Sequence, residues 1–302
     1  DAKKGKYIES DGGHLALNAE AGVNSIMYLD GSNNLVSYAL GVYLNKYNNP
    51  EAKGAEGSAW VITENAEVVG AYTLDNPADT QGGPQYFLSD WTGGVTYGND
   101  DANAAWMLEE VTAIPVTISA AGYATFYAPV ALALPEGLIA YEVTAQGEES
   151  VSLTPVNDII PAYNGVVLQG EANTTYNLTI PEYVPVAGSE NLLEGSVAAT
   201  FVESPAYVLG YVGEEGSKEV GFYTAAMNQN EGTAFLNNGF KAYLPKTGAA
   251  QALRFNFGGT TAIESVVNGI NANAAIYDLS GRRVEKATKG IYIVNGKKMI
   301  VK

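Results

Sequence analysis

The run Pro115-Val116-Thr117-Ile118-Ser119-Ala120-Ala121-Gly122-Tyr123-Ala124-Thr125-Phe126-Tyr127-Ala128-Pro129 decides the fold class of this chain. Its β-branched and aromatic residues, which favour extended backbone, lie on both sides of a small-residue turn at Gly122. The pattern predicts two strands around a glycine turn. Ile114-Pro115 reads as the linker into this region, and the later prolines, Pro129 among them, fall mainly at strand ends, where a missing N–H costs no ladder hydrogen bond.

Strand-like runs of the same kind continue to residue 258, bounded by Gly, Pro, Asn and Asp. Their spacing, about 8 to 15 residues, indicates a sandwich or a barrel, and we expect residues 114–258 to form a β-sandwich. The 302 residues include 20 Tyr and 34 Gly and are 46% hydrophobic, enough apolar material for real cores. We therefore predict an all-β protein.

A loose internal repeat runs through residues 1–111. In its two better copies, a strand with an aromatic–Leu pair precedes a polar loop and a strand opened by tryptophan, Trp60 in one copy and Trp106 in the other. A weaker first copy begins near Tyr7. A repeat of this length predicts one structural unit that recurs in space.

Three such units of about 40 residues resemble the ricin-type β-trefoil, in which a closing Gln-x-Trp packs its indole into the core. The matching tripeptides here are Ser58-Ala59-Trp60 and Ala104-Ala105-Trp106, which lack the glutamine. The resemblance implies a β-trefoil-like domain at residues 1–113, while the missing glutamine separates this chain from the sugar-site pattern of that family.

The central region resembles a β module of surface proteins of anaerobic gram-negative bacteria. The matching pieces include Gly122 to Tyr127, Leu134-Pro135-Glu136-Gly137, Gly165 to Leu168 and Val220 to Tyr223. The resemblance implies a location on the cell surface and carries no chemistry.

The C-terminal tail, residues 276–302, is basic, whereas the rest of the chain is acidic. Residues 276–302 carry seven basic and two acidic side chains, whereas the whole chain has a net charge of −17. We predict three short strands at 275–279, 290–294 and 297–301, after a low-complexity linker at 259–274. Asn295-Gly296 is the dipeptide favoured in a two-residue type I′ hairpin, because both positions need a positive φ.

The tail also resembles the C-terminal sorting domain of the type IX (Por) secretion family. The matching residues are Tyr277-Asp278 with Gly281-Arg282, then Lys289-Gly290 with Tyr292 and Val294, and the basic final strand. An upstream Asn-Pro strand usual in that family is missing. The resemblance implies a small C-terminal β module at 275–302 that addresses the protein for secretion or for the outer surface of a gram-negative bacterium.

Charge and composition argue against several classes of function. A net charge of −17 repels nucleic-acid phosphates and anionic lipid. No apolar run approaches the roughly 20 residues that span a bilayer, so we expect neither a nucleic-acid partner nor membrane insertion. The chain contains no Cys, which removes disulfides, thiolate metal sites and cysteine nucleophiles.

We expect no enzyme activity, no cofactor and no metal site. The single histidine, His14, allows no multi-histidine metal site, and no Gly-x-Ser-x-Gly elbow is present. Glu109 and Glu110 are adjacent in a strand-like run, where neighbouring side chains point to opposite faces. Asp100-Asp101 and the other acidic neighbours fit solvated turns better than a catalytic pair or a calcium loop.

Trp91 is the sharpest candidate for a ligand site. It lies in the polar glycine turn Ser89 to Gly94, where a large apolar side chain has no obvious core to enter. A sugar can stack on an exposed aromatic ring while carboxylates bond its hydroxyls. We therefore consider a sugar platform of Trp91 with Asp90, Tyr86 and Tyr97; the alternative is that Trp91 closes the base of the trefoil.

These features favour a non-catalytic secreted or cell-surface protein that binds glycan or a host or matrix protein through its N-terminal domain. Two alternatives stay open. The chain could be the accessory C-terminal region of a larger surface hydrolase, or a structural assembly or adhesion subunit. The sequence does not specify an oligomeric state.

Overall fold

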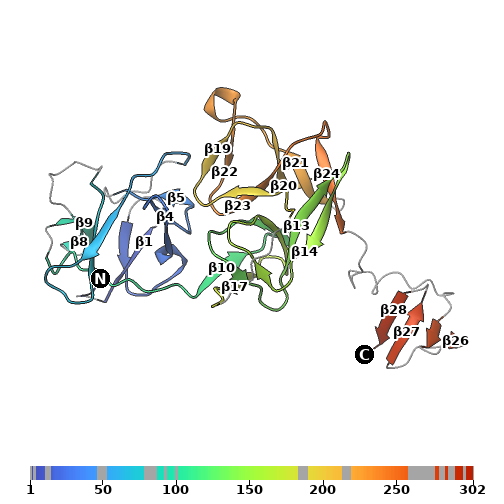
Figure 1. The fold of residues 1–302 in the computed structure, drawn as a ribbon, viewed down its shortest axis with the longest axis horizontal. Helices are drawn as coiled ribbons and strands as arrows, with labels where there is room; N and C mark the ends of the chain where they lie inside the picture. Colours follow the sequence, from blue (N-terminus) through green and yellow to red (C-terminus); the bar gives the residue numbers. More distant parts are fainter. Residues whose placement is uncertain are drawn as a thin grey trace. The chain divides into compact units, whose positions relative to one another are not determined.

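The computed structural model describes residues 2, 5–10, 15–45, 53–77, 87–91, 94–98, 101–182, 190–212, 219–257, 276–278, 283–284, 290–294 and 297–301. Within them the regular structure is β-strand, interrupted by two short 3₁₀ turns, Val23–Ser25 and Asn230–Gly232. The predicted all-β class is confirmed (Figure 1). The chain divides into two compact units, Asp1–Asn256 and Phe257–Lys302.

The N-terminal part of the first unit is built from small antiparallel sheets. Three are pairs and one has three strands: β1 (Tyr7–Ser10) with β2 (Leu15–Asn18), β3 (Met27–Leu29) with β4 (Leu35–Ser37) and β5 (Val42–Tyr43), β6 (Val61–Glu64) with β7 (Tyr72–Asp75), and β8 (Phe87–Trp91) with β9 (Gly94–Gly98). Their apolar side chains share one core, formed by Leu15, Leu35, Leu44, Trp60, Leu74, Leu88, Val95 and Trp106.

The two tryptophans of the sequence repeat occupy equivalent places in that core. Trp60 is 2% exposed and its indole N–H donates to the carbonyl of Leu44 at 3.0 Å; Trp106 is 3% exposed and donates to the carbonyl of Leu88 at 2.8 Å. A buried indole N–H needs such an acceptor. The two copies of the sequence repeat therefore share the same hydrogen bond, from an indole N–H to the backbone carbonyl of a leucine.

The central part contains a four-stranded sheet, a nine-stranded sheet and a pair. The four-stranded sheet runs β10 (Ala113–Thr117), β17 (Thr175–Thr179), β12 (Leu132–Ala133), β15 (Ile159–Ile160). The nine-stranded sheet runs β11 (Tyr123–Phe126), β16 (Val166–Gln169), β13 (Ile139–Gln146), β14 (Ser150–Pro155), β24 (Ala252–Phe257), β21 (Glu219–Thr224), β20 (Ala206–Val212), β23 (Lys241–Pro245), β18 (Glu194–Ser196). The pair is β19 (Thr200–Val202) with β22 (Phe235–Asn237).

The segment around Gly122, residues 113–126, supplies one strand to each of the two larger sheets of the central part. β10 pairs with β17, whereas β11 pairs with β16, and Gly122 between them has a φ of +82°. Side chains from both sheets share a core that includes Ile118, Phe126, Leu132, Leu168 and Leu178. The glycine turn thus carries the chain from one layer to the other.

We predicted a β-sandwich for residues 114–258. Two sheets do pack on each other around the shared core, but the arrangement as a whole is not a simple sandwich. The nine-stranded sheet curls into a nearly closed, barrel-like form, and its first strand β11 comes close to β23, where the Tyr127 N–H donates to the Phe240 carbonyl at 3.1 Å. The β13–β14 register shifts between Val143 and Ala145. Such a bulge increases local twist, which favours a curled sheet over two flat layers.

The predicted boundary at residues 113/114 lies inside the first unit. Val36 belongs to the same buried core as Ile114 and Phe126, and the Tyr38 hydroxyl donates to the Pro115 carbonyl at 2.7 Å. N-terminal and central strands therefore share buried contacts.

The second unit contains a four-stranded sheet in the order β26 (Arg283–Val284), β25 (Ile276–Asp278), β27 (Gly290–Val294), β28 (Lys297–Val301). Three of these strands match the predicted ones, and β26 is additional. The register pairs Val294 with Lys297, so two residues separate the strands, as the hairpin prediction requires. The turn itself and the linker at 259–274 lie outside the described residues.

Candidate functional site

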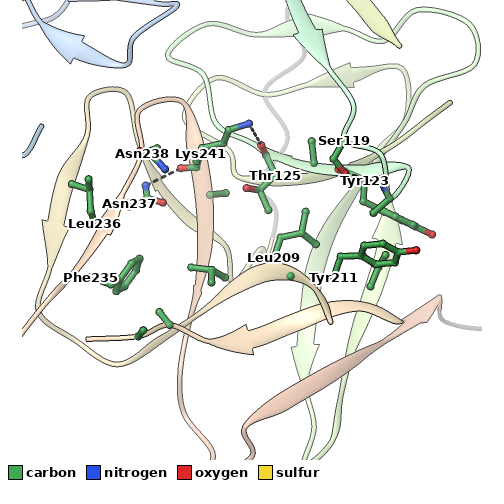
Figure 2. A pocket seen from close by; sticks show the side chains of 18 of the residues that line it. Ser119, Tyr123, Thr125, Leu209, Tyr211, Phe235, Leu236, Asn237, Asn238 and Lys241 are labelled. Carbon is green, nitrogen blue, oxygen red and sulfur yellow. Dashed lines mark hydrogen bonds between the residues drawn. The ribbon is translucent and has the colours of Figure 1, made fainter. Parts of the chain in front are cut away.

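A cavity of about 830 Å³ opens inside the curled sheet of the central part. Its walls come from the end of β10 and the turn after it, from β11, and from β20 to β23 (Figure 2). Apolar side chains such as Leu209 and Phe235 lie in these walls beside the amides of Asn228, Gln229 and Asn237. Its size falls in the range of small-ligand sites, and its mixture of apolar wall and few polar groups is typical of them.

Lys241 is the only charged side chain among the described residues that line this cavity. It begins β23, and its Nζ donates to the backbone carbonyl of Thr125 on β11 at 3.4 Å (Figure 2). Within the described part of the chain, no carboxylate forms an ion pair with it. Lys241 as a whole is exposed, and partial loss of hydration lowers its pKa from the ordinary value of 10.5.

The amide of Asn237 is held in a fixed direction beside this lysine. Asn237 is 3% exposed, and its Nδ2 donates to the Ser196 hydroxyl at 2.8 Å and to the Lys241 carbonyl at 3.0 Å. Because a buried amide with two bonds loses its rotational freedom, it fixes the backbone from which the Lys241 side chain extends. The site thus combines a positioned cation with an apolar wall.

The backbone brings Trp91, Asp90 and Tyr97 into one hairpin. β8 and β9 pair Trp91 with Gly94, Asp90 with Val95 and Leu88 with Tyr97. Asp90 is 1% exposed, so its carboxylate faces the interior and not a sugar in solvent. The side chains of Trp91 and Tyr97, and all of Tyr86, lie outside what the structure describes.

Of the other residues that the sequence singled out, some are described by the structure and others are not. Glu109 and Glu110 are both exposed, whereas His14 and Asp100 lie outside the described residues. Across the described residues, no three His, Cys, Asp or Glu side chains gather in a way that could hold a metal ion. Nor does this part of the chain contain a helix with the length and apolarity to cross a membrane.

A second cavity of about 400 Å³ lies in the N-terminal part. It is lined by Ile8, Met27, Leu74, Trp106 and Leu108 among others, with Glu109 and Glu110 at its border. Among the described residues that line it, the charged ones are Glu109 and Glu110, and none is a cation.

Sequence reasoning missed Lys241. The run Lys241-Ala242-Tyr243-Leu244 reads only as a short strand, and the structure confirms β23 there with Lys241 exposed at its start. The single available signal is a lysine that opens a strand in an acidic protein, and that signal does not indicate which wall the side chain faces.

Comparison of the chain with known proteins finds no matching family model, no matching curated protein and no matching solved structure.

Proposed function

We propose that this chain is a non-catalytic binding protein of the cell surface that holds a negatively charged ligand in the central cavity. The observation that carries the proposal is Lys241, a cation whose Nζ bonds a backbone carbonyl and has no carboxylate partner among the described residues. Lys241 is exposed at the cavity, so it can attract an anion from solvent and exchange its weak bond to the carbonyl for an ion pair.

The composition of the walls supports binding over chemistry. Near Lys241 the cavity presents amides and hydroxyls, such as Asn237 and Thr125, and no described His, Asp or Glu. General acid–base catalysis most often uses His and also uses Asp, Glu, Lys and Tyr, and of these types the described lining holds Lys241 and the tyrosines Tyr123 and Tyr211. The described walls favour holding a ligand over transforming it.

The N-terminal part and the C-terminal tail bear on the proposed domain arrangement and on the proposed location. The matched bonds of Trp60 and Trp106 support a trefoil-like arrangement of residues 1–113. The resemblance of the tail to a secretion sorting domain supports the outer surface of a gram-negative bacterium. The glycan platform at Trp91 has less support than the central cavity, because Asp90 is buried.

Calorimetric titration tests the proposal. The probes are polygalacturonate fragments and Asp/Glu-containing peptides, each compared with a neutral counterpart of the same length. We expect an acidic probe to bind one site and to lose at least tenfold in affinity in Lys241→Met. The matched control is Lys246→Met, just beyond the other end of β23, where Nζ bonds the Thr224 hydroxyl at 2.8 Å. Absence of binding by every acidic probe at millimolar concentration, or equal binding by Lys241→Met, would overturn the proposal.

A further inference from the structure

Tyr163 is an exposed tyrosine in a strained turn between β15 and β16. The residue is 58% exposed, and its φ is +57°. This left-handed backbone suits glycine and costs free energy for a residue with a Cβ. Full burial of the ring does not offset that cost, because more than half of the residue faces solvent. Strained residues of this kind gather at ligand sites.

Three contacts fix the direction of the Tyr163 side chain. Its backbone N–H donates to the Ala128 carbonyl at 2.7 Å, and its hydroxyl shares a hydrogen bond of 2.9 Å with the Tyr28 hydroxyl on β3. Its ring meets the Tyr127 ring edge to face, with centroids 6.4 Å apart. The ring is therefore held at both ends before a ligand arrives, which lowers the entropy that binding costs.

Tyr127 links this exposed ring to a carboxylate. A Cβ at Gly195 would overlap the Tyr127 ring, so that ring lies against the backbone of β18. Burial raises the pKa of Tyr127, and so do the neighbouring Tyr163 hydroxyl and Glu194 carboxylate. The Tyr127 hydroxyl therefore lies close to both groups. Glu194 is exposed and accepts a hydrogen bond from the Tyr243 hydroxyl at 2.9 Å.

The polar atoms around Tyr163 offer donors and acceptors together. The bond between the Tyr28 and Tyr163 hydroxyls uses one of their two hydrogens and leaves the other to donate outward. The Tyr127 hydroxyl makes no hydrogen bond with the described residues and is not buried. Glu194 keeps one carboxylate oxygen that accepts nothing from the described part of the chain.

A neutral sugar ring matches this arrangement. One face of a pyranose carries C–H groups that pack on an aromatic ring, and its rim carries hydroxyls that both donate and accept. An anion would be repelled by Glu194 and by the net charge of −17. A cation would be attracted, but it offers no acceptor to the phenol hydrogens.

We propose that the exposed face of Tyr163 binds a neutral saccharide, whose ring stacks on the tyrosine and whose hydroxyls bond the Tyr127 hydroxyl and the Glu194 carboxylate. None of these three residues lines the central cavity. The inference goes beyond the proposed function, because the ligand is neutral and the site is a different one.

Calorimetric titration of the full chain with cellotetraose, maltotetraose and mannotetraose tests the inference. We expect one of them to bind a single site and to lose roughly tenfold or more in affinity in Tyr163→Asn, which removes the ring and tolerates a positive φ. Tyr163→Phe keeps the ring and should bind more tightly than Tyr163→Asn. The matched control is Glu231→Asn, at another exposed residue with a φ of +58°, and its affinity should equal that of the wild type.

Tyr127→Phe separates binding from structure. Its hydroxyl has no hydrogen-bond partner among the described residues, so the free energy of unfolding should stay the same. The saccharide affinity should fall several-fold, because a sugar hydroxyl loses its partner. Unchanged affinity in either Tyr163→Asn or Tyr127→Phe, or no binding by any of these saccharides at millimolar concentration, would overturn the inference.

Two further outcomes distinguish the alternatives. If tetramethylammonium binds with dependence on Tyr163 and no saccharide does, the site recognises cations and the saccharide inference is wrong. If a saccharide binds as expected and every acidic probe fails at the central cavity, the proposed function falls and this inference stands.

Discussion

The Nζ of Lys241 lies 3.4 Å from the backbone carbonyl oxygen of Thr125, and this contact joins two strands that share no ladder. β11 and β23 approach at the Tyr127–Phe240 bond and then separate around the central cavity. A charged side chain therefore lies where a barrel would otherwise continue its backbone hydrogen bonds. The cavity and the position of the cation both follow from this incomplete closure.

The pH dependence of stability should differ between the wild type and Lys241→Met. Desolvation lowers the pKa of Lys241 in the folded state, so between that pKa and its unfolded value the unfolded chain binds more protons. The free energy of unfolding contributed by Lys241 therefore rises as the pH increases through this window. Urea unfolding of both proteins from pH 7 to 10 measures the difference.

Tyrosines with a raised pKa make the free energy of unfolding fall as the pH rises. Their effect is the same in the wild type and in Lys241→Met, so it cancels in the difference between the two proteins. Burial and the hydrogen bond to Glu194 raise the pKa of Tyr243 to about 12, so its contribution is lost only at still higher pH and in both proteins. A difference between the two proteins that stays constant with pH would contradict the desolvation of Lys241.

Removing either core tryptophan should cost a similar, large stability. Both indoles are buried and bond a leucine carbonyl, and truncation of a core Trp to Ala costs about 3–5 kcal/mol. We expect Trp60→Ala and Trp106→Ala to fall in this range by denaturant unfolding. A loss below about 1 kcal/mol in one variant would show that the two sites are not equivalent.

Glycine at position 239 should be required for the packing of N-terminal on central residues. A Cβ there would overlap the Gly41 Cα and lie 2.6 Å from the Gly41 carbonyl oxygen, and Gly41 itself has a φ of +63°. Gly239→Ala should therefore destabilise the protein by about 1–3 kcal/mol, because backbone on both sides must shift. Gly248→Ala is the control, since nothing lies within 4 Å of its Cβ position. Equal melting temperatures for the two variants would contradict the close approach.

The Tyr38 hydroxyl should stabilise the same contact. It donates to the Pro115 carbonyl at 2.7 Å while its ring packs edge-on against Phe240, with centroids 4.7 Å apart. Tyr38→Phe keeps the ring and removes the bond, so we expect a loss of about 1 kcal/mol in the free energy of unfolding. The control Tyr163→Phe removes an exposed bond to the Tyr28 hydroxyl and should cost less.

Much of the fold could be predicted from local sequence. Strands around Gly122 and in the tail follow from β-branched and aromatic runs bounded by turn residues, and burial of Trp60 and Trp106 follows from the repeat. The curl of the nine-stranded sheet could not be predicted, because it depends on a bulge near Val143 and on pairings between distant strands.

The candidate site was less accessible to prediction for the same reason. Asp90 reads as a polar turn residue, yet it lies in β8 and is buried. Lys241 and Thr125 are 116 positions apart in sequence, and only the near closure of the sheet brings them together. A local pattern reports the type of each strand but not which strand edges remain open.

The central claim is that Lys241 receives the anionic group of a ligand, and NMR titration of its side-chain nitrogen tests this most directly. The pKa of Lys241 should lie below its ordinary value in the free protein and should rise when the tightest acidic probe saturates the cavity, because a nearby carboxylate stabilises the ammonium. The Lys246 pKa should stay unchanged. A Lys241 pKa that is the same with and without saturating probe would contradict the account.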